Sequence, residues 1–502
     1  MKAVDLLRSL NLGKSVAEFD EGLDRYFVDT ETFRKLTLDE ADIIAGDKGT
    51  GKTALYRTLC IRYTQIPELK KTEIVAGFNP QGSPIFQRLS QIPPLSEGEY
   101  IAIWKLYIFS LVGNWLLQLY ERNLTAKMVK LEEILNVCGL RSVDDTASTI
   151  FSKLANKMQR IFNPKSAQVE FGFSETGYPS MTPKLEFGAD SEVADILSDP
   201  ARVPCDEYLA LLNRALEEGD LTTWVVLDRL DEAFQGFPQV ETPALRALFR
   251  TYLDMQAYRL CKLKIFVRRD VFRKIIKGGF VNLTHINARK LEIRWDEDDL
   301  RNLLIRRVKD SREFAEALGI RDETDEAIFY RIFPDQVRQG ERQSKTWKWM
   351  MSRIRDGNDI KPPRNLIDLV EKAREAQIRS EERDPHDIGP GIAIISADAI
   401  AKAQRQLSET RVEDTLLAEA AELAPLIDKF RNGRAEHNLQ SLAETLGVSQ
   451  EEVKATIKPL QELGFLEETG STFKVPMLYR DSLRIAQGKA FEAAKPDDAE
   501  DE

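Results

Sequence analysis

An eight-residue glycine-rich segment constrains this chain more than any other feature, because few folds can accommodate it. Residues 46–53 read GDKGTGKT, which fits the Walker A pattern G-x-x-x-x-G-K-[ST]. The apolar run ADIIA at 41–45 predicts a strand before the segment, and Ala54 to Tyr63 predicts a helix after it. A strand, this loop and a helix in that order are typical of a P-loop α/β fold.

The chemistry of the loop points to a bound nucleotide. Glycines let backbone N–H groups turn inward around phosphates, and the following helix directs its positive end at them. In this arrangement Lys52 reaches the β- and γ-phosphates, and Thr53 coordinates Mg²⁺. We therefore predict ATP and Mg²⁺ as the cofactors. The predicted nucleotide-binding residues of the loop are Gly46, Asp47, Lys48, Gly49, Thr50, Gly51, Lys52, Thr53 and Ala54.

A second apolar run, Trp224–Leu227, ends at an acid. The Mg²⁺-facing (Walker B) strand of a P-loop enzyme requires such an acid, and Asp228 can hold the water shell of the metal. A nearby acid can then orient the attacking water. Because Arg229 follows Asp228 directly, the common Asp-Glu pair is absent, and Asp231 or Glu232 must serve as the catalytic acid. The alternative interpretation is a solvated acidic start of a helix.

The composition narrows the class of protein. The net charge is −11, from 82 acidic and 71 basic residues, and this mild acidity disfavours a wholesale nucleic-acid coat. Four cysteines and three histidines are scattered along the chain without a CxxC pair. This spacing argues against structural zinc and histidine-based catalysis, and it fits a reducing cytosol. We predict a cytoplasmic protein.

The stretch from Ile101 to Tyr120 is long and apolar enough to cross a membrane. Lys105, Asn114 and Gln118 interrupt it, and a central lysine is expensive in lipid. We therefore predict a buried helix with no membrane contact, and a membrane-spanning helix is the alternative. The N-terminus lacks the long apolar core of a signal peptide.

The predicted fold class is an α/β P-loop NTPase core of the ASCE type with a parallel sheet. A long segment separates the strand predicted at 72–78 from the Walker B strand, which predicts an insertion at about 81–203. The insertion is helical, with a hairpin predicted at 167–188. The predicted domains are an ATPase core over 1–290, a helical lid over 291–410, a winged helix over 411–490 and an acidic tail over 491–502.

The winged helix is predicted from residues 421–478. A helix at 439–446 ends at Gly447, Ser449 can cap a third helix that runs from 450 to 463, and a two-stranded wing surrounds Gly470. The third helix offers Lys454 and Lys458 to DNA, but it also carries three glutamates, which offset the attraction to phosphate. A packing or protein-contact role is therefore favoured over DNA reading.

The Walker A loop at 46–53 and the Walker B segment at 228–232 together resemble those of the STAND/AAA+-like P-loop ATPases. The resemblance is strongest to bacterial stand-alone ATPases of the replication-initiator-like group, and some of these ATPases are encoded near phage-defence genes. The resemblance covers about residues 10–375. The segments that carry it are GKSVAEFDEGLDRYF at 13–27, DRLDEAF at 228–234, FVRRDVF at 266–272 and IRW at 293–295.

The resemblance implies two further nucleotide contacts. The family has an arginine just past the strand that follows Walker B, where Arg268 and Arg269 stand as catalytic candidates that sense the γ-phosphate. The alternative is a surface arginine or one paired with Asp270. Arg364 in KPPR resembles the second sensor of replication-initiator ATPases, and the alternative is a helix-start arginine without a ligand.

The leading functional hypothesis is an ATP-driven switch that assembles with further copies of itself and controls an effector protein in trans. No nuclease, protease or deaminase pattern accompanies the nucleotide motifs. A place in anti-phage defence follows from the resemblance alone. The alternative is a DNA-handling ATPase of replication-initiator type, with DNA or RNA bound by the winged helix and by the basic stretch from Arg246 to Lys290. A third hypothesis is a nucleotide-binding scaffold that barely hydrolyses.

Overall fold

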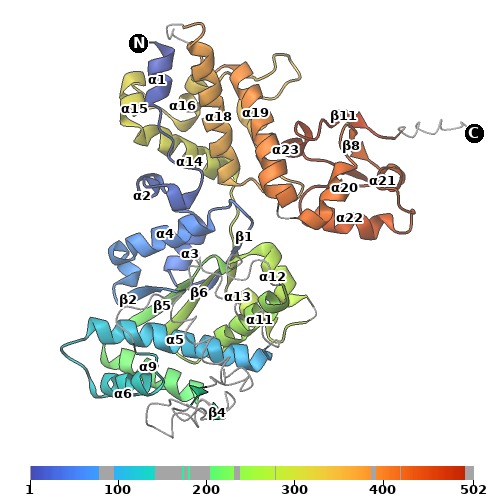
Figure 1. Ribbon diagram of the computed structural model, residues 1–502. Coiled ribbons are helices and arrows are strands. Elements are labelled where there is room, and N and C mark those ends of the chain that lie inside the picture. The colour runs from blue at the N-terminus through green and yellow to red at the C-terminus, as the bar shows by residue number, and fades with distance from the viewer. Residues whose placement is uncertain are drawn as a thin grey trace, which may run out of the picture. The chain divides into compact units, whose positions relative to one another are not determined.

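The chain forms two compact units, and each is described by itself. The computed structural model describes residues 2–77, 95–141, 172–173, 179–180, 204–230, 238–277, 279–385, 392–418 and 420–491. The unit that we call the sheet unit comprises Glu31–Gly46 and Lys52–Ile293. The unit that we call the helical unit comprises Met1–Thr30, Asp47–Gly51 and Arg294–Glu502. Figure 1 shows the elements of both.

The sheet unit is built on a five-stranded parallel sheet in the order β2-β5-β6-β1-β7. The strand β6 lies between β1, which leads into the glycine-rich loop, and β5, which ends before Asp228. An extra strand in that position defines the ASCE type, so the predicted fold class is confirmed. The strands are β1 (Ile43–Gly46), β2 (Thr72–Ala76), β5 (Thr222–Leu227), β6 (Cys261–Arg268) and β7 (Lys290–Glu292).

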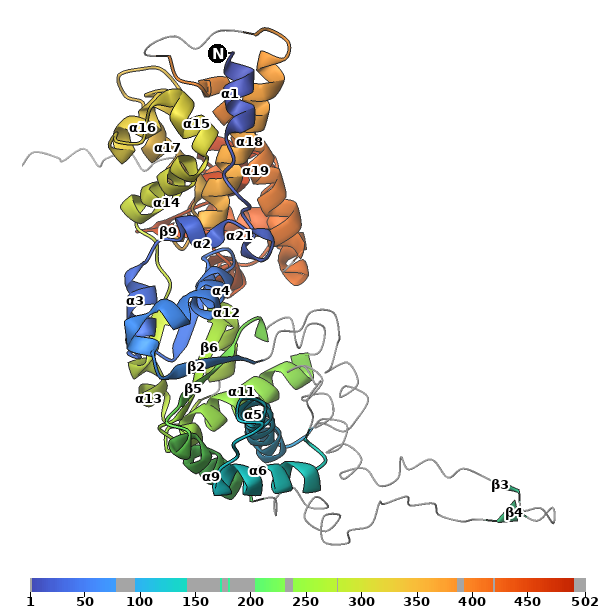
Figure 2. The ribbon, with the colours of Figure 1, turned by 90° about the vertical axis from the view of Figure 1, so that its left-hand side faces the viewer.

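Alternate residues of the strands face opposite sides of the sheet. On one side Ile43, Val225 and Ile265 belong to a large apolar core with helices α5, α9 and α11. On the other side Phe266 packs edge-on against Tyr56 of α4. Figures 1 and 2 show the sheet between α4 and the pair α5 and α11. The helices of this unit are α3 (Glu31–Thr37), α4 (Lys52–Arg62), α5 (Glu97–Leu119), α6 (Ala126–Val137), α9 (Cys205–Glu218), α11 (Pro238–Met255), α12 (Arg269–Ile276) and α13 (Leu283–Ala288).

The long apolar helix α5 is part of the protein core, as predicted. By length and composition it could cross a membrane, but 89% of its most apolar 18-residue window is buried inside the protein. Ser96 and Glu99 form a capping box at its start. Its single lysine, Lys105, makes ion pairs with Asp206 (2.8 Å) and Asp254 (2.7 Å). Paired in this way, the lysine is tolerated in a buried helix.

The predicted hairpin is described only in part. Strands β3 (Gly172–Phe173) and β4 (Pro179–Ser180) pair in antiparallel fashion, which places the second strand earlier than the predicted 183–188. The remaining residues of the hairpin lie outside the described ranges.

The helical unit combines the first thirty residues with the second half of the chain. Its lid region consists of packed helices, among which α18 and α19 lie side by side in both views. Arg374 of α18 donates to the carbonyl of Leu7 in α1 at 3.1 Å, which ties the N-terminus to this region. The helices are α1 (Ala3–Ser9), α2 (Leu23–Tyr26), α14 (Glu297–Asp310), α15 (Arg312–Leu318), α16 (Asp325–Ile332), α17 (Thr346–Ile354), α18 (Pro363–Glu381) and α19 (Ala397–Arg411), followed by the π-helical turn η7 (Val412–Leu417).

The C-terminal part of the helical unit has the element order of a winged helix, as predicted. Its mixed sheet has the order β11-β8-β10-β9, with β11 parallel to β8. Gly447 ends α21 in the left-handed conformation, and Ser449 exchanges capping hydrogen bonds with Glu452, although the α-helix itself begins only at Val453. The elements are α20 (Ala424–Asp428), β8 (Arg434–His437), α21 (Leu439–Leu446), α22 (Val453–Glu462), β9 (Glu467–Thr469), β10 (Thr472–Lys474), α23 (Met477–Arg480) and β11 (Ala486–Lys489).

Candidate nucleotide-binding site

The glycine-rich loop leaves β1 at Gly46 and enters α4 at Lys52. The carbonyl of Asp47 accepts hydrogen bonds from the backbone N–H (3.3 Å) and the hydroxyl (2.8 Å) of Thr50, which closes a tight turn. Gly49 (φ +78°) and Gly51 (φ +98°) lie in the left-handed region that favours glycine. Such a turn directs backbone N–H groups toward one concave side, as anion binding requires.

The lysine of the loop lies against the loop itself. Lys52 Nζ donates to the carbonyl of Gly46 at 2.9 Å, so its ammonium group is positioned at the mouth of the turn. The following helix α4 starts at this residue, which adds the positive end of its dipole. A cation and a helix N-terminus at one turn form an electrostatic environment suited to phosphate.

Three predicted site residues meet at the carboxyl edge of the sheet. Gly46 of β1 is the register partner of Arg268 in β6, and Leu227 of β5 is the partner of Ile265 in the same strand. Asp228 follows Leu227 directly, so it emerges at the same edge as the loop. Carboxyl ends of parallel strands are where open α/β sheets bind their ligands.

Asp228 is 2% exposed, and its charge acts on Cys60 of helix α4. Burial raises the pKa of the Cys60 thiol on α4 to about 11, and the negative charge of Asp228 contributes to the rise. The next residue, Arg229, has a φ of +58°, which is a strained conformation for a residue with a side chain. Strain of this kind is common at functional sites. Asp231 and Glu232 lie outside the described residues, so their predicted role stays a prediction.

The two candidate sensor arginines both contact acids. Arg268 makes two hydrogen bonds of 3.0 Å to Asp270, and Arg269 contacts Glu292 of β7 at 3.3 Å. Burial acts to raise the pKa of Asp270, but the charge and hydrogen bonds of Arg268, together with the Val271 N–H and the charge of Lys274, hold this pKa below its usual range. The pair with Asp270 is one of the two alternatives that the sequence left open. A γ-phosphate would have to compete with that carboxylate, and the sensor role stays a prediction.

Within the helical unit, the loop residues Asp47–Gly51 contact two side chains. The indole N–H of Trp295 donates to the carbonyl of Thr50 at 2.8 Å. A Cβ atom placed on Gly49 would lie 3.1 Å from Cβ of Arg364 and 3.4 Å from Cβ of Pro362, so these residues pack directly on the loop backbone. The contact with Arg364 is consistent with its predicted place at the nucleotide. Trp295 was not predicted, because an isolated tryptophan carries no pattern that identifies a backbone donor.

Arg364 differs from the other arginines of its helix. Within the described part of the chain its side chain makes no hydrogen bond or ion pair, and its Nε atom is buried without a partner. Arg374 and Arg379 of the same helix pair with glutamates one turn away. A buried donor without an acceptor is costly, which makes Arg364 a candidate for binding an anion.

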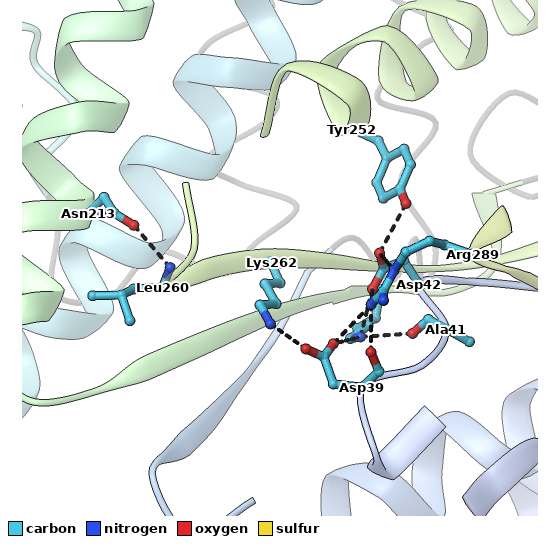
Figure 3. Close-up of polar contacts among 9 residues, drawn as sticks. Asp39, Ala41, Asp42, Asn213, Tyr252, Leu260, Lys262 and Arg289 are labelled. Atoms are coloured by element: carbon cyan, nitrogen blue, oxygen red, sulfur yellow. Dashed lines mark hydrogen bonds and ion pairs between the residues drawn. The ribbon is translucent and has the colours of Figure 1, made fainter. Parts of the chain in front are cut away.

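The basic stretch from Arg246 to Lys290 is engaged in contacts of its own. Lys262, Lys264 and Arg289 converge on the carboxylates of Asp39 and Asp42. Figure 3 labels Asp39, Asp42, Lys262 and Arg289 of this cluster. Asp42 and Arg289 directly precede β1 and β7, so the cluster lies at the amino-terminal edge of the sheet. That edge is opposite the one that bears the loop. Arg246 and Arg250 contact Glu97 and stack over Phe280. Much of the stretch therefore serves the fold.

Comparisons with known proteins find low similarity. No protein-family model matches the chain. It is 21% identical over 417 residues to a transposon gamma-delta protein of 80.3 kDa from Escherichia coli (strain K12), an alignment that covers 81% of this chain and 51% of that protein. The chain thus spans about half the length of this relative.

Similar solved structures belong to two archaea. The Walker-type ATPase PABY2304 of Pyrococcus abyssi is 13% identical with a TM-score of 0.37, and the match covers 95% of this chain and 100% of that one. The ORC2 protein of Aeropyrum pernix, in ADPNP and ADP complexes, is 12% identical with a TM-score of 0.29, over 90% of each chain. The ORC1 protein of the same organism, in complex with DNA, is 14% identical with a TM-score of 0.30, over 94% of this chain and 96% of that one.

Proposed function

We propose that this chain binds ATP with Mg²⁺ at the loop Gly46–Thr53 and hydrolyses it. The observation that supports the proposal most is the arrangement at the carboxyl edge of the sheet. A loop closed by Thr50 and opened to positive φ at Gly49 stands at the same edge as the buried acid Asp228, with β6 between their strands. Phosphate donors and a metal-facing acid at one edge are the elements that phosphoryl transfer requires.

The donor set fits ATP and Mg²⁺. Lys52 and the N–H groups at the start of α4 would bind phosphate oxygens, while Thr53 and Asp228 would hold the metal. Among the described residues, no three His, Cys, Asp or Glu side chains come together as a metal site, so the phosphates themselves would complete the coordination. Mg²⁺ would neutralise charge on the β- and γ-phosphates. Asp231 or Glu232 would orient the attacking water, and Arg268, Arg269 and Arg364 are the proposed contacts to the γ-phosphate.

We further propose that hydrolysis serves a conformational switch. Arg364 belongs to the helix that carries the lid, and its contact with Gly49 would let the lid respond to the γ-phosphate. A guanidinium supplied by a neighbouring copy would make assembly depend on ATP. It would form charge-assisted hydrogen bonds with the γ-phosphate oxygens, which ADP lacks. The partners would be further copies of this chain and an effector protein. A defence setting follows from the sequence resemblance alone.

The second candidate function is DNA handling, which the transposon description of the E. coli relative and the winged helix favour. However, the exposed Lys454 and Lys458 of α22 are accompanied by the exposed Glu462 of the same helix and by the exposed Glu451 just before it. The lysines of β6, Lys262 and Lys264, already form ion pairs with Asp39 and Asp42. Attraction to phosphate would therefore be weak. The switch is the better supported of the two.

The first experiment measures binding and turnover of ATP by the full chain. Lys52→Ala should weaken binding of an ATP analogue roughly hundredfold, because it removes the charge-assisted bonds to the β- and γ-phosphates. Glu232→Gln or Asp231→Asn should bind ATP normally and hydrolyse it slowly. The exposed Lys70, changed to alanine, is the matched control. Unchanged binding in Lys52→Ala would remove the loop assignment.

The second experiment separates the two functions. Light scattering should show a larger mass with ATP analogue and Mg²⁺ than with ADP, and duplex DNA at about 150 mM salt should bind weakly. If the measured mass is the same with ATP analogue and with ADP, and DNA binding is tight and salt-sensitive, the DNA-handling function would be supported instead of the switch.

A further inference from the structure

The arginine that packs on the loop lies in a cluster of three charged side chains on α18 and α19. Arg364 is the second residue of α18, and Asp368 lies one turn further along the same helix. Arg411 is the last residue of α19, and its guanidinium makes an ion pair with Asp368 across the two helices. One carboxylate therefore faces two guanidiniums.

Spacing alone would pair Arg364 with Asp368. Oppositely charged residues three or four apart on a helix are neighbours and attract each other. Two other arginines of α18 follow this rule, since Arg374 pairs with Glu371 and Arg379 with Glu375. Arg364 does not, because Asp368 is bonded to Arg411 instead. In the described residues its Nε atom is buried and has no acceptor.

Arg411 is held in this position by burial. Its residue is 8% exposed, and Val412 and Leu416 of the turn that follows are buried in the same apolar core as α18 and α19. Burial, and next the positive charge of Arg364, lower the pKa of Arg411 to about 10. The repulsion indicates that the two guanidiniums are close to each other. Breaking the ion pair would leave the buried guanidinium of Arg411 without a counter-charge, which costs free energy, so Arg411 retains Asp368.

We propose that Arg411 is a positioning residue that holds Asp368 away from Arg364 and thereby keeps the Arg364 guanidinium available for the γ-phosphate of ATP. This inference rests on the proposed function, because it assigns a partner to the nucleotide site proposed above. Without Arg411, Asp368 would turn to Arg364, and the phosphate would have to compete with a carboxylate one turn away. ADP binding would change little, since the contact proposed for Arg364 is to the γ-phosphate, which ADP lacks.

The test compares the affinities for a non-hydrolysable ATP analogue and for ADP, measured by calorimetry on the full chain. Arg411→Leu should lower the ratio of ATP-analogue to ADP affinity about tenfold. The double variant Arg411→Leu/Asp368→Asn should restore the ratio to within about twofold, because the competing carboxylate is gone. Arg411→Lys should keep most of the wild-type ratio. Arg379→Leu, which removes an exposed ion pair of the same helix, is the matched control.

The outcomes distinguish the inference from the proposed function. If Arg364→Ala leaves the ratio at the wild-type value, the proposed contact between Arg364 and the γ-phosphate fails. If Arg364→Ala lowers the ratio but Arg411→Leu does not, only the inference fails. A double variant that stays as weak as Arg411→Leu would also overturn it, since the loss would then come from packing. Should Arg411→Leu not fold, Asp368→Asn alone must keep the wild-type ratio, and a fall would contradict the inference.

Discussion

Two groups of cations in this molecule differ in how their charges are paired. In the sheet unit, the fully buried Lys264 donates to Asp39 (2.6 Å), to Asp42 (2.7 Å) and to the carbonyl of Ala41 (2.8 Å). Its ammonium also lies 4.1 Å from the centre of the Trp224 ring. Arg289 bonds the same two carboxylates, and Tyr252 donates to Asp42 at 3.0 Å. Every cation of this network has a carboxylate partner.

In the helical unit, Arg364 and Arg411 have one carboxylate within their cluster, that of Asp368, and Arg411 bonds it. The Nε atoms of both arginines are buried without an acceptor. A buried charge is tolerated only when an opposite charge pairs with it. The first network, in which each cation has a carboxylate partner, is therefore accounted for as part of the fold. Among the described residues the second group has two cations and one bonded acid, and the proposal that Arg364 binds an external anion starts from this mismatch.

The largest expected effect breaks the matched network. Lys264→Met should lower the free energy of unfolding by about 3–5 kcal/mol, because the buried carboxylates of Asp39 and Asp42 lose their shared cation. Urea denaturation followed by circular dichroism measures it. Lys71→Met is the control, since its ion pair with Asp220 is exposed and should contribute less than about 1 kcal/mol. A loss under 1 kcal/mol in Lys264→Met would mean that the network is not a stabilising element.

The next largest effect is expected on nucleotide binding rather than on stability. Arg364→Met should leave the free energy of unfolding within about 0.5 kcal/mol of wild type or raise it, because it removes a cation that no acid of the described residues pairs with. Binding of an ATP analogue should weaken roughly tenfold to hundredfold, through the loss of charge-assisted bonds. Calorimetry and urea denaturation on the same variant give both numbers. A variant that unfolds easily and binds ATP normally would place Arg364 with Lys264 as a structural cation.

The contrast between the two groups also marks what the sequence could predict. The strands β1, β5 and β6 are apolar runs, and the loop and Asp228 stand directly after two of them, so local patterns were sufficient. The strand β7 was missed because Lys290 and Glu292 flank its single apolar residue. Strand β8, with the sequence RAEH, was missed for the same reason.

The features that local patterns did not predict depend on contacts between residues far apart in the sequence. Lys264 lies in a strand whose alternation of lysine and apolar residues resembles a half-exposed surface strand, yet it is fully buried because Asp39 and Asp42 reach it from elsewhere in the chain. No spacing rule connects Arg411 to Asp368, or Trp295 to Thr50. Arg364 was predicted from a resemblance, whereas the pairing of Asp368 with Arg411, which leaves Arg364 without a carboxylate partner among the described residues, is visible only in the packed helices α18 and α19.

The third prediction concerns the shape of the loop. Trp295→Phe keeps an aromatic ring but removes the N–H that bonds the carbonyl of the buried Thr50, at a cost of about 1 kcal/mol. Affinities for ATP analogue and ADP should both fall about fivefold, because the contacts proposed for the loop are to phosphates that the two nucleotides share. Trp349→Phe is a matched control, since its indole N–H has no partner in the described structure. A loss confined to the ATP analogue would contradict this role.

The smallest expected effect is a difference in acid sensitivity. Burial acts to raise the pKa of Asp42, but Arg289 and Lys264 outweigh it, so this pKa lies below its usual value of 3.8, as does that of Asp39 beside Lys264 and Lys262. A carboxylate with a lowered pKa stabilises the fold above its unfolded pKa, and this stability is lost as pH falls through the lowered folded pKa. Between pH 5 and pH 3 the wild type should therefore lose stability more steeply than Lys264→Met, in which the pKa of Asp42 moves back up.

The difference is small because only the upper part of this titration is reached before other carboxylates are protonated. Urea denaturation at pH 5, 4 and 3 measures the two slopes. Arg364→Met should follow the wild-type slope, since Arg364 lowers the pKa of no carboxylate in the network around Asp42. Equal slopes for wild type and Lys264→Met would mean that Arg289 alone holds Asp42 ionised, and the matched network would then reduce to a single ion pair. A shallower slope for Arg364→Met would show that its guanidinium has an acidic partner after all, which would remove the contrast between the two groups of cations.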